Sequence, residues 1–220
     1  KPKVRCLVIQ LARLGDTIQS LMALRAAKQL YPQLEIHLLC RERFAAAAKR
    51  VPWIAQVITL PTDRLLLPVL RGDKTETQAM GDVARWVAPL VQHPWDMLVN
   101  WSFSEASSYL TGLLPSRVKL GYSRRRDATS SSSDGWSHYI QAIVQGGVEQ
   151  NIHLTDILTT QLLTALQIHV GEPADEGDAP VTSKGFFALE VGGSETFPGW
   201  KDPSRKWIGI QLGAGHDSKT

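Results

Sequence analysis

The 220-residue chain is 43% hydrophobic and 20% charged, which is typical of a globular protein with a sizeable core. Its formal net charge of +3 is too small to indicate nucleic-acid binding by itself. No apolar run reaches the roughly 18 residues that a membrane span needs. The opening residues Lys1–Arg5 lead straight into a predicted strand and leave no room for a signal peptide, so we expect a cytoplasmic protein.

The first sixty residues alternate between strand and helix patterns. The apolar run 6–11 is rich in branched side chains, as strands buried on both faces are. The predicted order is strand 6–11, helix 17–31, strand 35–40, helix 44–51 and strand 56–60. Because crossovers between parallel strands are right-handed, this βαβαβ order predicts an α/β fold with a Rossmann-like, doubly wound parallel sheet.

The next hundred residues continue the alternation. Two helices joined around Gly72 are predicted within 63–91. They are followed by strand 96–101, helix 105–113 and strand 118–122, and after an interruption by helices 136–144 and 154–166. The interruption, 123–135, contains three arginines and a serine run, and its polarity predicts a mobile basic loop.

The composition divides the chain into three parts. We expect a domain over 1–170 and a linker region over 171–205, which is acidic and Pro/Gly-rich over 171–184 and contains one strand at 186–191. The segment 206–220 contains a buried strand, 207–212, that runs into a glycine-rich turn. Such a turn normally opens a βαβ unit, so 206–220 is predicted to be the start of a truncated second domain.

Two segments carry a resemblance to a known family. One is Leu7–Leu21, which contains Arg13-Leu-Gly-Asp16, and the other is Ile208–Lys219, which contains Gly213-Ala-Gly215. With shorter stretches at 35–41, 118–122 and 151–158, they resemble the ADP-heptose:lipopolysaccharide heptosyltransferases, inverting enzymes of the GT-B fold. The resemblance implies that 1–170 is the N-terminal, acceptor-binding half and that the donor lies mainly on the C-terminal half. It further implies two partners: the nucleotide sugar ADP-heptose and an anionic glycolipid acceptor at the inner face of the inner membrane.

Asp16 is the candidate catalytic residue. It follows the first strand at the start of a helix, and ligands bind at that edge of open α/β sheets. Residue type alone favours a helix cap, whereas the resemblance places the general base of the family at this position. Inverting transfer needs a carboxylate that takes the proton of the acceptor hydroxyl.

The candidate donor-phosphate site is Gly213, Ala214, Gly215 and Lys219. The glycines would let backbone N–H groups approach a diphosphate, and Lys219 would neutralise the leaving group without a metal. No cofactor and no metal are therefore expected. A P-loop is rejected because Ser218 stands where its second glycine should be.

The candidate acceptor-binding residues are arginines. Arg13 and Arg41 follow predicted strand ends, and Arg43 and Arg124 lie in nearby basic clusters. Each is either a solvated surface residue or a ligand for the carboxylates and phosphates of a lipopolysaccharide inner core, which suit guanidinium geometry.

Two other functions stay open or are set aside. A non-catalytic carbohydrate- or nucleotide-binding module would keep only the acceptor half. A nicotinamide-binding Rossmann protein needs GxGxxG after the first strand, but only Gly15 is present there. Cys6 and Cys40 form no CxxC pair and are expected to be buried free thiols.

Overall fold

The computed structural model describes residues 2–125, 127, 129–132, 134–146 and 153–173. All of them belong to one compact unit, Lys1–Leu189. The elements are β1 (Val4–Gln10), α1 (Leu14–Leu30), β2 (Leu34–Arg41), η1 (Glu42–Phe44), α2 (Ala45–Lys49), β3 (Gln56–Leu60), α3 (Thr62–Leu70), α4 (Glu76–Gln92), β4 (Trp95–Asn100), α5 (Glu105–Leu113), β5 (Ser116–Arg124), β6 (Ser130–Ser132), α6 (Gly135–Gly146) and α7 (Leu154–Val170).

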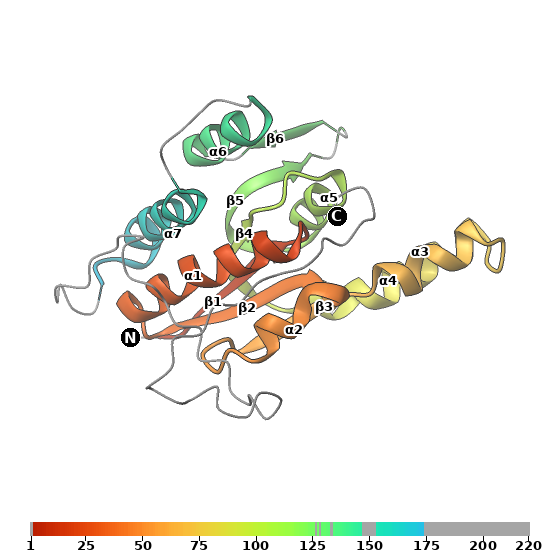
Figure 1. Ribbon diagram of the computed structural model, residues 1–220, viewed down its shortest axis with the longest axis horizontal. Coiled ribbons are helices and arrows are strands. Elements are labelled where there is room, and N and C mark those ends of the chain that lie inside the picture. The colour runs from red at the N-terminus through yellow and green to blue at the C-terminus, as the bar shows by residue number, and fades with distance from the viewer. Residues whose placement is uncertain (1, 126, 128, 133, 147–152, 174–220) are drawn as a thin grey trace, which may run out of the picture. The chain divides into compact units, whose positions relative to one another are not determined.

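One six-stranded sheet has the order β3-β2-β1-β4-β5-β6 (Figure 1). The first five strands are parallel, and β1 lies between β2 and β4. The predicted Rossmann-like α/β sheet is therefore confirmed, with the switch in strand order beside β1. In such sheets the loops after the strands on either side of the switch form the ligand-binding crevice.

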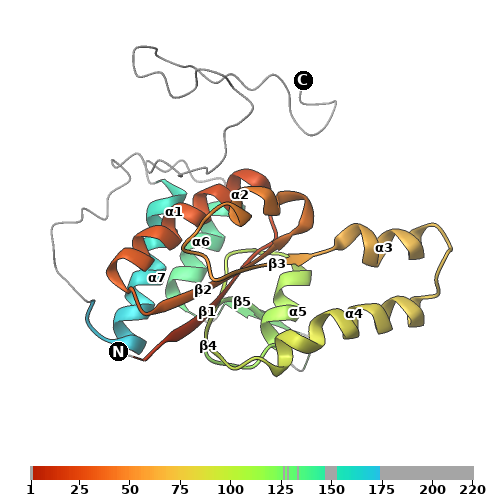
Figure 2. The same ribbon diagram turned by 90° about the horizontal axis from the view of Figure 1, so that it is seen from below.

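Helices cover both faces of the sheet, with α1, α6 and α7 on one side and α4 and α5 on the other (Figure 2). Strand residues alternate between the two resulting cores, as their period of two requires. Cys6, Val8 and Ile36 belong to the core with α1 and α7, whereas Leu7 and Leu39 belong to the core with α4 and α5.

The segment 123–135 is not simply the loop that its polarity predicts. Strand β5 continues to Arg124, and β6 pairs with it antiparallel in the register Tyr122↔Ser132 to Arg124↔Ser130. The turn is closed by Arg125 N–H, which donates to the carbonyl of Thr129 over 2.8 Å, and by Asp127, which accepts from Thr129. Backbone pairing thus orders these polar residues without a core of their own.

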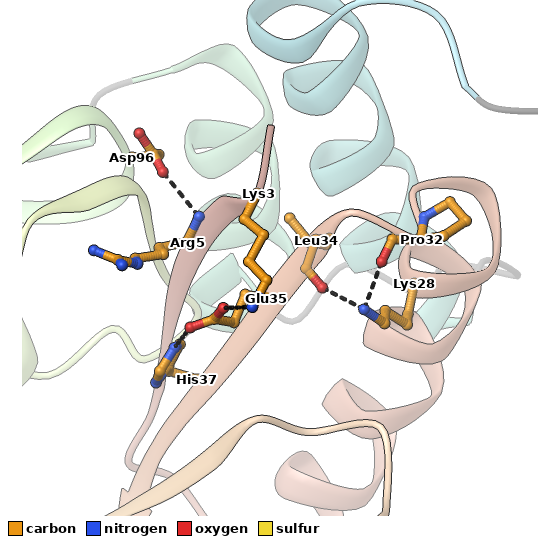
Figure 3. A network of polar contacts seen from close by, with 8 residues as sticks. All are labelled: Lys3, Arg5, Lys28, Pro32, Leu34, Glu35, His37 and Asp96. Carbon is orange, nitrogen blue, oxygen red and sulfur yellow. Dashed lines mark hydrogen bonds and ion pairs between the residues drawn. The ribbon is translucent and has the colours of Figure 1, made fainter. Parts of the chain in front are cut away.

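A polar network ties the beginnings of β1, β2 and β4 together at the amino end of the sheet (Figure 3). Arg5 N–H donates to Asp96 over 2.9 Å, and Glu35 pairs with Lys3 and His37 at 3.4 and 3.0 Å. The hydrogen bond with His37 is the main reason that the pKa of Glu35 lies below its usual value. The predicted crevice lies at the other, carboxyl end of the strands, so we assign the network a structural role.

Both cysteines are buried and unbridged, as expected. Burial raises the pKa of Cys6 to about 12 and that of Cys40 to about 11, so neither thiol ionises readily. Within the described residues, no helix is long and apolar enough to cross a membrane. The linker region 171–205, except for residues 171–173, and the segment 206–220 lie outside the described residues, so these boundaries stay predictions.

Candidate active site

Asp16 lines a cavity of about 280 Å³ at the carboxyl ends of β1 and β4. We call it the Asp16 cavity. Residues from the end of β1, the start of α1, the end of β2, the β4–α5 loop and the N-terminal halves of α6 and α7 surround it. Its lining residues are Gln10, Leu11, Ala12, Asp16, Arg41, Trp101, Ser102, Phe103, Ser104, Ile140, Leu154 and Leu158. The cavity thus occupies the crevice that the strand order predicts.

The local structure at the start of α1 anchors one oxygen of the Asp16 carboxylate. Helix α1 begins at Leu14, three residues earlier than predicted, so Asp16 is in the first turn and not at the cap position. Its Oδ2 accepts a hydrogen bond from Arg13 N–H over 2.9 Å. Within the described part of the chain, Oδ1 has no hydrogen-bond partner, and Asp16 is half-buried. Asp16 therefore has one anchored and one available oxygen.

A buried network of side chains holds the β1–α1 loop, which leads into the helix turn that contains Asp16. Gln10 donates to Ser20 over 3.0 Å and accepts from Ala12 N–H over 3.1 Å, and Ser102 donates to the same Gln10 oxygen over 3.3 Å. Ser20 in turn donates to the carbonyl oxygen of Asp16 over 2.8 Å. Because buried polar groups are costly unless paired, this network fixes the β1–α1 loop against the end of β4.

Trp101 lines the Asp16 cavity, and hydrogen bonds from its indole and backbone N–H groups fix its position. Its indole N–H donates to Gln161 Oε1 over 2.8 Å, and its backbone N–H donates to the carbonyl of Ile9 over 3.0 Å. The Gln161 amide donates to Ser137 over 2.7 Å and to Asp134 over 3.2 Å. The orientation of the indole is therefore coupled to the start of α6.

Asp134 is the anchor of that second network. Its carboxylate accepts from Ser137 N–H over 2.8 Å, from the Ser137 hydroxyl over 2.6 Å and from Gly121 N–H over 3.1 Å. Burial opposes ionisation of this carboxyl, but the hydrogen bonds from Ser137, Gly121 and Gln161 outweigh it and hold its pKa below the usual value. Asp134 thereby joins β5 to α6, beside the Asp16 cavity.

We expect Asp134→Asn to lower the free energy of unfolding by about 1–3 kcal/mol at pH 7, because an amide cannot accept on both atoms. Because the pKa of Asp134 is lowered in the folded state, its carboxylate stabilises the fold fully at pH values above the pKa of an unfolded aspartate, about 3.9. That stabilisation is lost as the pH falls through the folded-state pKa. Urea denaturation at pH 7 and pH 3 should show the gap between parent and variant narrowing in acid. An equal gap at both pH values would contradict the role of the charge.

The four candidate arginines are not gathered in one place. Arg41 lines the Asp16 cavity, and Arg13 is exposed at the N-cap of the helix whose first turn contains Asp16. Arg43 is exposed and stacks over the Phe44 ring at 5.2 Å. Arg124 lies over the Tyr109 ring at 4.5 Å and 3.7 Å from Glu105, outside the lining of the Asp16 cavity. Of the four, Arg41 is therefore the one that lines the cavity, and it is exposed to solvent there.

The predicted donor-phosphate residues Gly213, Ala214, Gly215 and Lys219 lie outside the described residues and stay predictions. Across the described ranges, no group of three or more His, Cys, Asp or Glu side chains is placed to hold a metal ion. Sequence reasoning missed Gln10, Ser102, Trp101 and Asp134. The Asp134-Gly135 pair before a helical pattern is a usual N-cap signal, so Asp134 was open to prediction. The first three carry no comparable local signal.

Comparison with solved structures identifies the same fold in glycosyltransferases. The chain is similar to E. coli heptosyltransferase WaaC with ADP-2-deoxy-2-fluoro heptose, with a TM-score of 0.52 and 16% identity over 81% of this chain and 52% of that one. It matches WaaC with ADP at a TM-score of 0.52 and 15% identity, again over 81% and 52% of the two chains. A glycosyl transferase family 9 structure from Veillonella parvula matches at a TM-score of 0.50 and 16% identity, over 79% and 44%.

At these identities the similarity concerns the fold. No family profile and no curated protein matches the sequence. The chain spans about half the length of the WaaC structures that it matches. Its described residues thus form the Rossmann-like α/β fold that is shared with about half of each of these heptosyltransferase chains.

Proposed function

We propose that this chain provides the acceptor-binding half of an inverting glycosyltransferase. The reaction would transfer heptose, or a related sugar, from ADP-heptose to the inner core of lipopolysaccharide. The observation that carries the proposal is the position of Asp16: a half-buried carboxylate, with one oxygen anchored and one available, in a cavity at the sheet's switch point. The shared fold with heptosyltransferase structures supports the same class of reaction.

In the proposed mechanism Asp16 acts as the general base. Oδ2 stays on Arg13 N–H, which fixes the carboxylate plane, while Oδ1 takes the proton from an acceptor hydroxyl. The hydroxyl oxygen attacks the anomeric carbon from the face opposite the diphosphate, and ADP leaves. Arg41, at the border of the cavity, would bind an anionic group of the acceptor.

The remaining assignments concern residues and partners outside the described site. Lys219, with Gly213, Ala214 and Gly215, would neutralise the diphosphate as ADP departs, so the proposed reaction uses no metal and no cofactor. Arg13, Arg43 and Arg124 would contribute to the approach of the anionic acceptor. The protein would act in the cytoplasm, peripherally at the inner face of the inner membrane.

The acceptor site is tested by isothermal titration calorimetry of the chain with a deacylated, phosphorylated inner-core oligosaccharide. We expect saturable binding that Arg41→Gln weakens by roughly 10- to 100-fold, the usual range for a hydrogen bond to a charged group. Arg50→Gln is the matched control, since Arg50 is an exposed arginine at the end of α2. Equal affinity for a neutral oligosaccharide of the same size, or equal losses in both variants, would contradict an anionic acceptor at Arg41.

A further inference from the structure

A second, larger cavity lies next to the Asp16 cavity, and its lining is almost entirely apolar. It has a volume of about 490 Å³ and lies between the end of β3 and helices α3, α4 and α5. We call it the α3–α4 cavity. Leu60, Leu65, Leu66, Trp86, Leu110 and Leu113 supply much of its wall. The indole N–H of Trp86 donates a hydrogen bond to the carbonyl of Thr59 over 3.1 Å. Because its polar group is paired, the ring offers the cavity an apolar surface.

Helix α3 continues this surface away from the sheet. Five of its nine residues are Leu or Val, and none of its residues is buried. Leu66 is 53% exposed and Leu70 is 79% exposed. Together with α4 it forms an arm that projects beyond the sheet in both views (Figures 1 and 2). A groove of about 390 Å³ runs between the two helices and shares Leu65, Leu66 and Val83 with the α3–α4 cavity.

The α3–α4 cavity is continuous with the proposed acceptor site. Leu11, Arg41 and Ser104 line both cavities. Arg41 is the one charged residue among those that line the α3–α4 cavity. The apolar α3–α4 cavity therefore adjoins, at Arg41, a smaller cavity that carries the polar side chains Gln10, Asp16 and Ser102 among apolar ones. This order of surfaces matches a molecule with an alkyl chain, an anionic group and a hydroxylated head.

We propose that the α3–α4 cavity and its groove bind an alkyl chain of the lipid acceptor, with the acceptor's anionic group at Arg41. The inference rests on the proposed function and extends it from the sugar head to the lipid. Apolar pockets of about 300–1,000 Å³ commonly bury most of a small ligand. Burial of alkyl carbon would supply much of the affinity, while Arg41 and Asp16 would set the position of the head.

The charges on the arm favour insertion of a single chain over electrostatic adsorption to an anionic bilayer. Basic and acidic residues are equal in number between 62 and 92. Several are paired with each other or with the body: Lys74 with Asp82 at 2.6 Å, Arg85 with the same Asp82, and Arg64 with Glu42 at 3.0 Å. Adsorption to anionic lipid draws instead on clustered, unpaired Lys and Arg.

The test is a titration of the 220-residue chain with octyl, decyl and dodecyl phosphate, each below its micelle concentration. The dissociation constant should fall about three- to fourfold for each added methylene, the factor that burial of one CH₂ gives. Leu66→Asp should abolish this dependence on chain length. Ile168→Asp, on α7, is the matched control, because Ile168 is 70% exposed and lines neither cavity. Arg41→Gln should weaken all three ligands by a similar factor and leave the chain-length dependence intact.

Several outcomes would overturn the inference. They are the absence of binding, an affinity independent of chain length, or the same dependence in Leu66→Asp as in the parent with both proteins folded by circular dichroism. Sedimentation tests whether a second copy of the chain covers the α3–α4 cavity instead. A dimer that is dissociated by Leu66→Asp but not by dodecyl phosphate would assign the cavity to that second copy. Because the titration needs no donor and no turnover, it separates this inference from the proposed function. Alkyl binding without sugar transfer would contradict the proposed function and leave the alkyl site standing. Sugar transfer with equal KM for acylated and deacylated acceptors would contradict the alkyl site and leave the proposed function standing.

Discussion

Replacing Asp16 with asparagine should lower kcat by roughly 10²- to 10⁴-fold, the usual cost of losing a general base. Asparagine keeps the size of the side chain, and its carbonyl oxygen can still accept from Arg13 N–H as Oδ2 does now. The free energy of unfolding should therefore change by no more than about 1 kcal/mol, the value of a charge at a helix N-terminus. Steady-state transfer and a melting curve for each protein give the two quantities.

The matched control is Asp63→Asn, because Asp63 is also a first-turn aspartate but lines neither cavity. Its turnover should be normal. A structural role for Asp16 predicts near-normal turnover after the substitution as well. Turnover of Asp16→Asn within about threefold of the parent, a difference of under 1 kcal/mol in activation free energy, would leave Asp16 a helix-start residue without a catalytic role.

Replacing Gly121 with alanine should destabilise the fold by about 3 kcal/mol or more, since two costs add. Gly121 has a φ of +98°, where side chains with a Cβ are strained. A Cβ there would also lie 2.2 Å from the carbonyl oxygen of Asn100, its partner on β4. The oxygen belongs to the backbone, so relief requires β4 and β5 to separate beside the loop that carries Trp101 and Ser102.

Chemical denaturation of Gly121→Ala and Gly81→Ala measures this effect against a control. Gly81 lies within α4, where an added Cβ meets only the end of the Arg85 side chain at 3.7 Å. Its replacement should be neutral or should stabilise by up to about 1 kcal/mol, since alanine is the better helix former. A loss of under 1 kcal/mol for Gly121→Ala would show that the close approach to Asn100 is not required.

The parallel sheet was predictable because its strands are short, apolar and separated by helical patterns. The apolar run 6–11 and the four later strand patterns contain no competing helix signal. Both ends of β1 to β5 lie within two residues of the predicted bounds. The segment 123–135 was not predictable in the same way. Backbone pairing with β5 orders the serines of β6, and that pairing depends on tertiary context and not on side-chain pattern.

The residues of the candidate site also divide into those that the sequence pattern predicts and those that only the tertiary structure brings together. The placement of Asp16 and Arg41 at one cavity could be predicted, because each lies at the end of an apolar strand and the carboxyl ends of parallel strands meet at one edge. Their roles stay predictions. The placement of Gln10 and Ser102 could not be predicted, since they read as ordinary polar residues until the fold brings them within 3.3 Å of each other. The α3–α4 cavity also has no sequence signal of its own. Its leucines have the pattern of a core helix, and only the structure shows that α3 has no buried residue.

The proposed function is tested most directly by acceptor-dependent release of ADP from the product of the complete open reading frame. The protein is mixed with ADP-heptose, with and without a lipopolysaccharide inner-core acceptor, and ADP is measured with the sugar product. If Asp16 is the general base, ADP release and sugar transfer should be stoichiometric, should require the acceptor and should fall at least 100-fold in Asp16→Asn. Binding of donor and acceptor without any acceptor-dependent release would contradict a glycosyltransferase and would assign the chain to a non-catalytic binding module.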